Sequence, residues 1–162
     1  MSRFIASGFA RCRQDDAASA GARGADEVAE AILTEAQKRD ASVQLVRNGS
    51  RGMHWLEPLV EVEQEGKRIG FANVDEGDVA ALFDAEFLTK AEHESCIGEV
   101  DEHPFLAKQE RLTFARCGII DPLDLDAYEE HGGLVGLKRA IELSREEIVG
   151  DVMQSGLRGR GG

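Results

Sequence analysis

The part of the sequence best suited to binding a ligand is residues 156–162, GLRGRGG, which follow a predicted helix. Glycines let a backbone approach an anion closely, and the interleaved arginines supply positive charge for a phosphate group. The segment is not a dinucleotide-binding fingerprint, because no strand is predicted before it and its spacing is not G-x-G-x-x-G. An ordinary chain end also fits this composition, so the pattern alone leaves both interpretations open.

Thiol and imidazole groups are too dispersed along the chain to indicate a redox or metal motif. Cys12, Cys96 and Cys117 form no C-x-x-C pair, which a thiol–disulfide enzyme requires. The four histidines show no H-E-x-x-H or comparable ligand spacing. These spacings therefore predict no catalytic residue and no metal ligand. We interpret Cys117 as a packed thiol, Trp55 as a core residue, and the acidic clusters as solvated faces.

The charge balance excludes several classes of partner. The 162 residues contain 31 Asp and Glu against 19 Lys and Arg, for a net charge of -12. Phosphate recognition depends on clustered basic residues, and an anionic membrane surface repels an acidic protein, so neither nucleic acid nor membrane is an expected partner. No apolar run approaches the roughly 20 residues of a membrane span. The low cysteine count and the lack of a signal-like N-terminal region predict a cytoplasmic protein.

Residues 1–89 show the periodicity of an α/β domain. Apolar residues recur at helical spacing from Ala25 to Arg39, and the turn signal Glu65-Gly66 separates two alternating runs. In order, the pattern predicts strand 3–10, helix 25–39, strand 42–47, hairpin strands 59–63 and 68–74, and a helix from about 78 to 88. This order, βαβ followed by ββα, is typical of a thioredoxin-like fold.

The remainder is predicted to be mostly helical. Residues 90–103 are polar and acidic, and we interpret them as a linker. Helices are expected over 104–117, ending at Gly118, over 124–143 with a break at Gly132-Gly133, and over 145–154. Ser144 and Glu147 have the spacing of a capping box before the last helix.

Several motifs in the helical part occur together in one known family. They are Lys108-Gln109-Glu110-Arg111, Gly118-Ile119-Ile120-Asp121-Pro122, Tyr128 before Gly132-Gly133, and SGLRGRGG from Ser155 to Gly162. Residues 104–162 resemble the NADH-oxidising flavoprotein subunit of respiratory complex I. They also resemble its soluble relatives, the diaphorase subunit of NAD-reducing hydrogenases and the beta subunit of NAD-dependent formate dehydrogenases.

This resemblance implies a place for the glycine-rich segment. In the family, the corresponding loop cradles the FMN phosphate and borders the NADH site, so Gly159, Arg160, Gly161 and Gly162 are the expected cofactor-binding residues. The family continues with the rest of an FMN domain and a [4Fe-4S] domain. We therefore expect the chain to stop inside the FMN loop and to bind FMN poorly alone.

The first part carries a second resemblance. NGSRGMHWLEPLVEVEQEGKRIGFANVDEGDV resembles the thioredoxin-like [2Fe-2S] domain found at the front of several such subunits. Relatives that bind the cluster have cysteines where this chain has Ser50 and His54, and only Cys12 loosely matches another ligand position. A [2Fe-2S] cluster needs four protein ligands. We therefore expect a degenerate domain with no [2Fe-2S] cluster, and the phrase SRGMHWLEPL favours a formate dehydrogenase beta subunit.

Two functions remain open from the sequence. The first is part of a flavoprotein subunit that transfers electrons between NAD(H) and FMN or iron–sulfur clusters, and this fragment itself is expected to be inactive. Its implied partners are a [2Fe-2S] gamma-type subunit and a molybdenum or tungsten catalytic subunit. The second is a non-catalytic module that joins subunits. The electron donor, formate or hydrogen, stays undetermined.

Overall fold

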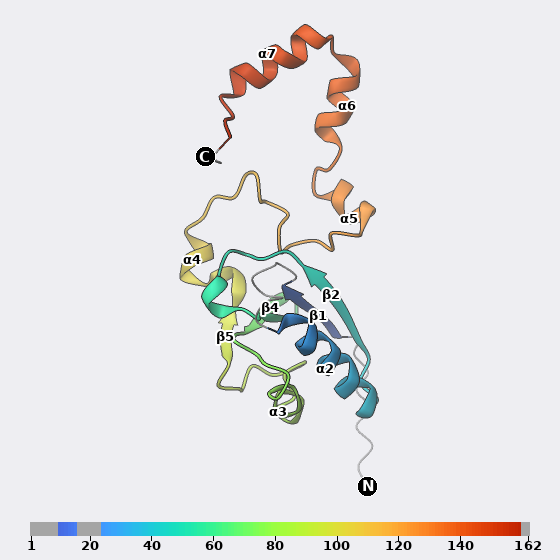
Figure 1. Ribbon diagram of the computed structural model, residues 1–162, viewed down its shortest axis with the longest axis vertical. Coiled ribbons are helices and arrows are strands. Elements are labelled where there is room, and N and C mark those ends of the chain that lie inside the picture. The colour runs from blue at the N-terminus through green and yellow to red at the C-terminus, as the bar shows by residue number, and fades with distance from the viewer. Residues whose placement is uncertain (1–9, 16–23, 160–162) are drawn as a thin grey trace. The chain divides into compact units, whose positions relative to one another are not determined.

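The computed structural model describes residues 10–15 and 24–159, and the chain divides into two compact units, Met1–Leu123 and Asp124–Gly162 (Figure 1). Each unit is described by itself. No helix in the described ranges is long and apolar enough to cross a membrane.

A five-stranded sheet with the order β2-β1-β3-β4-β5 forms the centre of the first unit. Strand β1 pairs parallel to β2 and antiparallel to β3, and β4 pairs antiparallel to both β3 and β5. Helix α2 makes the crossover between the two parallel strands, and α3 follows the β3–β4 hairpin. The bounds are β1 Ala10–Asp15, α2 Ala25–Lys38, β2 Val43–Asn48, β3 Val60–Gln64, β4 Lys67–Phe71, α3 Val79–Asp84 and β5 Cys96–Glu99.

This topology confirms the predicted α/β, thioredoxin-like fold. Helix α2 buries Val28, Ile32 and Ala36 along one stripe, as its periodicity predicts. The hairpin turns at Glu65 and Gly66, which both have positive φ, at 50° and 79°. Two central residues with positive φ produce the turn whose twist matches that of paired strands.

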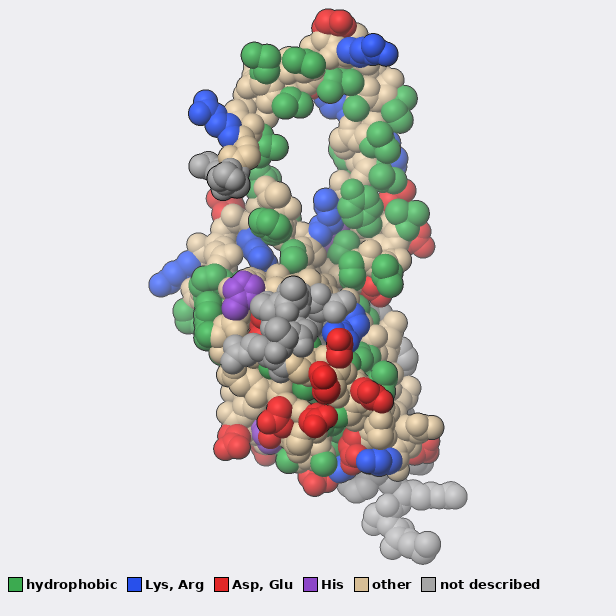
Figure 2. Space-filling view, viewed as in Figure 1, with side chains coloured by type: hydrophobic (Ala, Val, Ile, Leu, Met, Phe, Trp, Pro, Cys, Tyr) green, Lys and Arg blue, Asp and Glu red, His purple; other side chains and the backbone are tan. Residues whose placement is uncertain are grey.

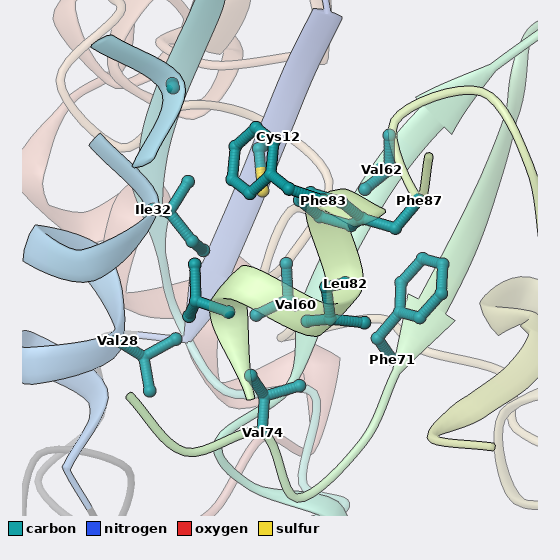
Figure 3. Packing of buried hydrophobic residues seen from close by; sticks show 12 residues of the cluster. Cys12, Val28, Ile32, Val60, Val62, Phe71, Val74, Leu82, Phe83 and Phe87 are labelled. Atoms are coloured by element: carbon teal, nitrogen blue, oxygen red, sulfur yellow. The ribbon is translucent and has the colours of Figure 1, made fainter. Parts of the chain in front are cut away.

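The main core lies between the sheet and helices α2 and α3 (Figure 3). Val60 and Val62 of β3 point toward Ile32 and Leu82 from the two helices. Phe87 packs edge-to-face on two other rings, with centroids 5.5 Å from Phe71 and 5.1 Å from Phe83. Both helices therefore cover one face of the sheet. A smaller apolar cluster contains Met53, Leu59, Ala72, Val100 and Leu106.

Two elements of the first unit differ from the sequence prediction. The described first strand runs over Ala10–Asp15, past the predicted end at residue 10, and the rest of the predicted strand, residues 3–9, lies outside the described part. Its sequence, ARCRQD, lacks apolar alternation, and its position follows from pairing with strands on both sides. The predicted linker 90–103 contains β5 and the 3-10 helix η2, Val100–Glu102. Gly70 permits this close pairing, because a Cβ there would lie 2.7 Å from Val100.

The predicted helix over 104–117 is also wrong beyond its first turn. Helix α4 covers only Pro104–Ala107, with His103 accepting a hydrogen bond from the Phe105 backbone N–H at its start. Residues 108–120 continue as irregular backbone and turns. Tertiary contacts from the side chains of Arg111 and Cys117 to the carbonyl oxygens of Arg51 and Ser50 hold this segment against the loop at 49–52.

The second unit contains three short helices, as predicted. They are α5 Leu125–Glu130, α6 Val135–Glu142 and α7 Arg145–Ser155. Gly132 adopts a φ of 77°, and Gly133 has no room for a Cβ, so the break falls where the glycine pair predicts it. Both hydrogen bonds of the Ser144–Glu147 capping box are present. No residue within these three helices is buried, and apolar side chains cover much of their visible surface (Figure 2).

Candidate functional site

The loop between β2 and β3 brings together the two positions at which cluster-binding relatives have cysteines. The Ser50 hydroxyl donates to Glu57 Oε1 over 2.6 Å, and His54 Nδ1 lies 3.1 Å from the same oxygen. The Gly52 backbone N–H donates to Ser50 Oγ over 2.9 Å. Ser50 and His54 therefore converge on one buried carboxylate.

Beside these residues, Arg51 forms a buried ion pair that the sequence analysis did not anticipate. Its Nε and Nη2 each lie 2.8 Å from a different carboxylate oxygen of Glu61, and its Nη1 lies 2.7 Å from Asp101 Oδ1. The Arg51 side chain is 2% exposed. Burial lowers the pKa of Arg51, but the carboxylates of Glu61 and Asp101 outweigh it, so the net pKa is raised. Burial also raises the Asp101 pKa, and Arg51 and Arg68 reverse that into a net lowering.

Arg68 of β4 completes this ionic network. Its Nη1 lies 3.5 Å from Glu61 Oε2 and its Nη2 lies 3.4 Å from Asp101 Oδ2. Arg68 also donates to the carbonyl oxygen of Gly118. Two guanidinium groups and two carboxylates cancel in charge, so the network has no spare positive charge to attract an anion. Its geometry instead ties the loop, β3, β4 and η2 to one another.

Aromatic residues flank the loop at the surface. Trp55, in the 3-10 helix η1 (His54–Leu56), is 52% exposed, contrary to the expectation that it is a core residue. Its ring packs edge-to-face on Phe105 of α4, with 5.0 Å between centroids. The nearby apolar cluster of Met53 and Leu59 fills the interior instead.

The three cysteines lie in different surroundings. Cys12 lies in the main core, where burial, with a smaller contribution from the Glu61 carboxylate, raises its pKa to about 12. It is therefore a packed thiol that stays protonated at neutral pH. Cys117 donates from Sγ to the Ser50 carbonyl oxygen over 3.2 Å, so it is packed as predicted, although not in a helix. Within the described ranges, no three His, Cys, Asp or Glu side chains gather as a metal site.

The predicted phosphate-binding residues fall at the edge of the described chain. Helix α7 ends at Ser155, and Gly156 follows in a left-handed conformation with φ of 65°. Gly159 is exposed, and a Cβ placed on it would meet no atom within 4 Å. Arg160, Gly161 and Gly162 lie outside the described residues.

The ionic network escaped sequence reasoning because its charged residues sit at positions that normally face solvent. In LVEVE, Glu61 alternates with Val60 and Val62, which predicts an outward side chain. That side chain does lie on the opposite face from the main core, but the loop carrying Arg51 covers it. The only sequence signal for this network was an arginine, Arg51, in a glycine-containing loop before an acidic strand. Such a combination is too common to be diagnostic.

Comparison with known proteins gives partial matches. No protein-family model matches the sequence. The NADP-reducing hydrogenase subunit HndC of Solidesulfovibrio fructosivorans is 44% identical over 55 residues, which are 34% of this chain and 11% of HndC. The chain thus matches only about a tenth of the length of that curated relative.

Among solved structures, similarity is to thioredoxin-like ferredoxins. The wild-type thioredoxin-like [2Fe-2S] ferredoxin from Aquifex aeolicus aligns with a TM-score of 0.48 and 15% identity, covering 57% of this chain and 100% of that one. A cysteine-to-serine variant of the same ferredoxin aligns with a TM-score of 0.45 and 15% identity, covering 56% and 100%.

These neighbours correct one expectation. The first domain was expected to have no [2Fe-2S] cluster, yet the solved structures that resemble it are [2Fe-2S] ferredoxins. The expectation counted thiolates by sequence position alone. The described residues provide no set of cluster ligands, so we assign none and derive no electron-transfer step through such a group.

Proposed function

We propose that this chain is part of an electron-transferring oxidoreductase subunit of the NADH-oxidising flavoprotein type. The main support is the 44% identity to a hydrogenase subunit over 55 residues. The sequence SGLRGRGG, placed directly after a capped helix, is a second observation in favour. The thioredoxin-like topology of the first unit is consistent with a subunit that includes a ferredoxin-type domain.

Within this proposal, residues 159–162 begin the loop that holds the FMN phosphate. Bound FMN would accept a hydride from NADH and release electrons singly. The contribution of this chain is a backbone without side chains at Gly159, where a phosphate can approach unhindered, and positive charge from the neighbouring Arg158 and Arg160.

The finer assignment is a soluble NAD-dependent formate dehydrogenase, of which this chain is part of the beta subunit. The phrase SRGMHWLEPL supports it, whereas the name of the matched relative keeps hydrogen as the alternative donor. The partners would then be a [2Fe-2S] gamma-type subunit and a subunit that oxidises formate at molybdenum or tungsten.

One experiment tests both the oxidoreductase proposal and the finer formate dehydrogenase assignment. The protein is tagged and purified from its native host with its bound subunits, and NAD+ reduction is measured separately with formate and with hydrogen. Activity with formate and a flavin content near one per complex would support the formate dehydrogenase assignment. Activity with hydrogen alone would overturn that assignment but would still support the broader assignment as an oxidoreductase subunit. A complex with neither flavin nor NAD+ reduction would overturn the function altogether.

A second candidate function, a module that joins subunits, is favoured by the second unit. Its helices α6 and α7 leave Leu137, Ile141, Val149 and Met153 exposed, although such side chains normally stabilise a protein when buried. In the same purified complex, Ile141→Ser with Met153→Ser is expected to release the other subunits without changing the thermal unfolding of the first unit. Retention of every subunit would contradict this candidate.

A further inference from the structure

Residues 108–120, which we call the strap, run across the loop residues 49–52. One end of the strap is attached by Arg111, whose Nη2 donates to the Arg51 carbonyl oxygen over 3.3 Å. The other end is attached by the Cys117 thiol, which donates to the Ser50 carbonyl oxygen over 3.2 Å. Both attachments use carbonyl groups of the loop, so strap and loop satisfy each other's polar groups.

The contact at the second end leaves no spare space. Gly118 has a φ of 77°, and a Cβ there would lie 2.8 Å from Cγ of Arg51. A Cβ on Gly49 would lie 2.9 Å from the Cys117 sulfur. Arg68, a member of the ionic network, also donates to the Gly118 carbonyl. The strap therefore lies directly on the side chain of Arg51.

Between its two ends, the strap makes little contact with the protein. Residues 112–115 are all exposed, with Leu112 at 90% and Phe114 at 65%. A segment with few buried contacts and only turn-type backbone hydrogen bonds opens more easily than the strands of the sheet. The contacts to residues 49–52 and Arg68 contribute to holding the strap closed.

We propose that the strap is a gate over residues 49–52 that opens and closes as one unit and is latched by Arg51. Arg51 supplies a carbonyl acceptor for one end and the packing surface for the other, while Glu61 and Asp101 fix its guanidinium in place. Opening frees the carbonyls of Ser50 and Arg51 for another polypeptide while the sheet stays folded. This gate does not depend on the function proposed above.

Hydrogen–deuterium exchange followed by mass spectrometry tests the gate in the full chain. In the wild type, peptides covering the strap and residues 49–52 are expected to exchange with the same opening rate, faster than β1 and β3. Arg111→Gln removes a hydrogen bond from a charged donor, so we expect exchange in both segments to rise about tenfold. Lys108→Gln, which removes an exposed charge from the strap without touching the loop, is the matched control and should change neither segment.

A second variant tests the other attachment of the strap. Gly118→Ala places a methyl group against Arg51 and is expected to accelerate hydrogen exchange of the strap and of residues 49–52 further. Unchanged protection of β3 from exchange would confirm that the sheet remains folded. Trypsin cleavage of the wild type after Arg111 and Arg116 provides an independent readout. The cleavage rate should fall as the fraction of molecules with a closed strap rises. Faster exchange of the strap with residues 49–52 unchanged would overturn the gate, and so would a wild-type strap that already exchanges at the unprotected rate.

Discussion

The substitution Glu61→Gln tests whether the ionic network is a structural necessity of the first unit. Arg51 is buried, and Glu61 supplies two of its three charge-assisted hydrogen bonds, each of 2.8 Å. Glutamine keeps the shape but removes the charge and turns one acceptor into a donor facing the guanidinium. Removing one partner of a buried ion pair costs about 3–5 kcal/mol, and here two guanidinium groups would be left with the Asp101 carboxylate alone.

Urea unfolding followed by Trp55 fluorescence measures this cost. Trp55 is the only tryptophan in the chain and lies four residues from Arg51, so its signal reports on the first unit. At a typical slope of about 2 kcal/mol per molar urea, the midpoint should fall by roughly 1.5–2.5 M. Because single domains have only about 5–15 kcal/mol of stability, this loss shortens the folded baseline at 25 °C, and measurement at 10 °C lengthens it.

Two further variants separate the electrostatic cause from a general effect of the substitution. Glu63→Gln makes the same chemical change at an exposed position of the same strand and should alter stability by no more than about 0.5 kcal/mol. The double variant Arg51→Met with Glu61→Leu removes both charges and should recover most of the loss, since apolar pairs often replace buried ion pairs without penalty. If Glu61→Gln matches Glu63→Gln in midpoint, the carboxylate does not compensate Arg51 and the reasoning is refuted.

Three other measurements follow from single side chains. Cys12, with its thiol pKa raised to about 12, should react with iodoacetamide at pH 8 at least about a hundredfold more slowly in the native protein than in urea, as counted by mass spectrometry. Gly133→Ala places a Cβ 2.4 Å from the Tyr128 carbonyl oxygen and should reduce the helical circular dichroism signal, whereas Gly136→Ala, with open space, should preserve it. Hydrogen bonds from the N-cap residue lower the Glu147 pKa, so the capping of α7 is complete above the ordinary pKa of 4.5 and is lost as pH falls through the lowered value. A carboxyl NMR titration of Glu147 with an ordinary midpoint would contradict that last expectation.

The elements that sequence reasoning predicted correctly are those specified by local chemistry. Helix α2 carries its own apolar stripe, the β3–β4 hairpin its own turn residues, and α7 its own capping box. The elements it misplaced depend on distant partners. Strand β1 has only Ala10 and Cys12 as apolar residues and is fixed by neighbours on both sides, and β5 needs the absence of a side chain at Gly70.

The candidate site was only half predictable for the same reason. Ser50 and His54 were identified by their positions, but their shared hydrogen-bond acceptor, Glu57, was not. The buried pair of Arg51 and Glu61 was missed entirely, because alternation in a strand shows which face a residue occupies and not what covers that face. A loop that returns across the sheet is a tertiary feature with no periodic signal.

The strap changes what the family motifs can be taken to mean. Arg111 of the K-Q-x-R segment and Gly118 of G-x-x-D-P both lie before the division of the chain at residue 123, and both contact the first unit. Arg111 reaches the Arg51 carbonyl with its guanidinium, and glycine suits the second position because a Cβ there would lie 2.8 Å from Arg51. Since packing within the first unit accounts for both residue types, neither adds weight to a flavin site. Support for that site from motifs therefore rests on the residues after Ser155, and variants at residues 159–162, not at Arg111 or Gly118, are the ones that test it.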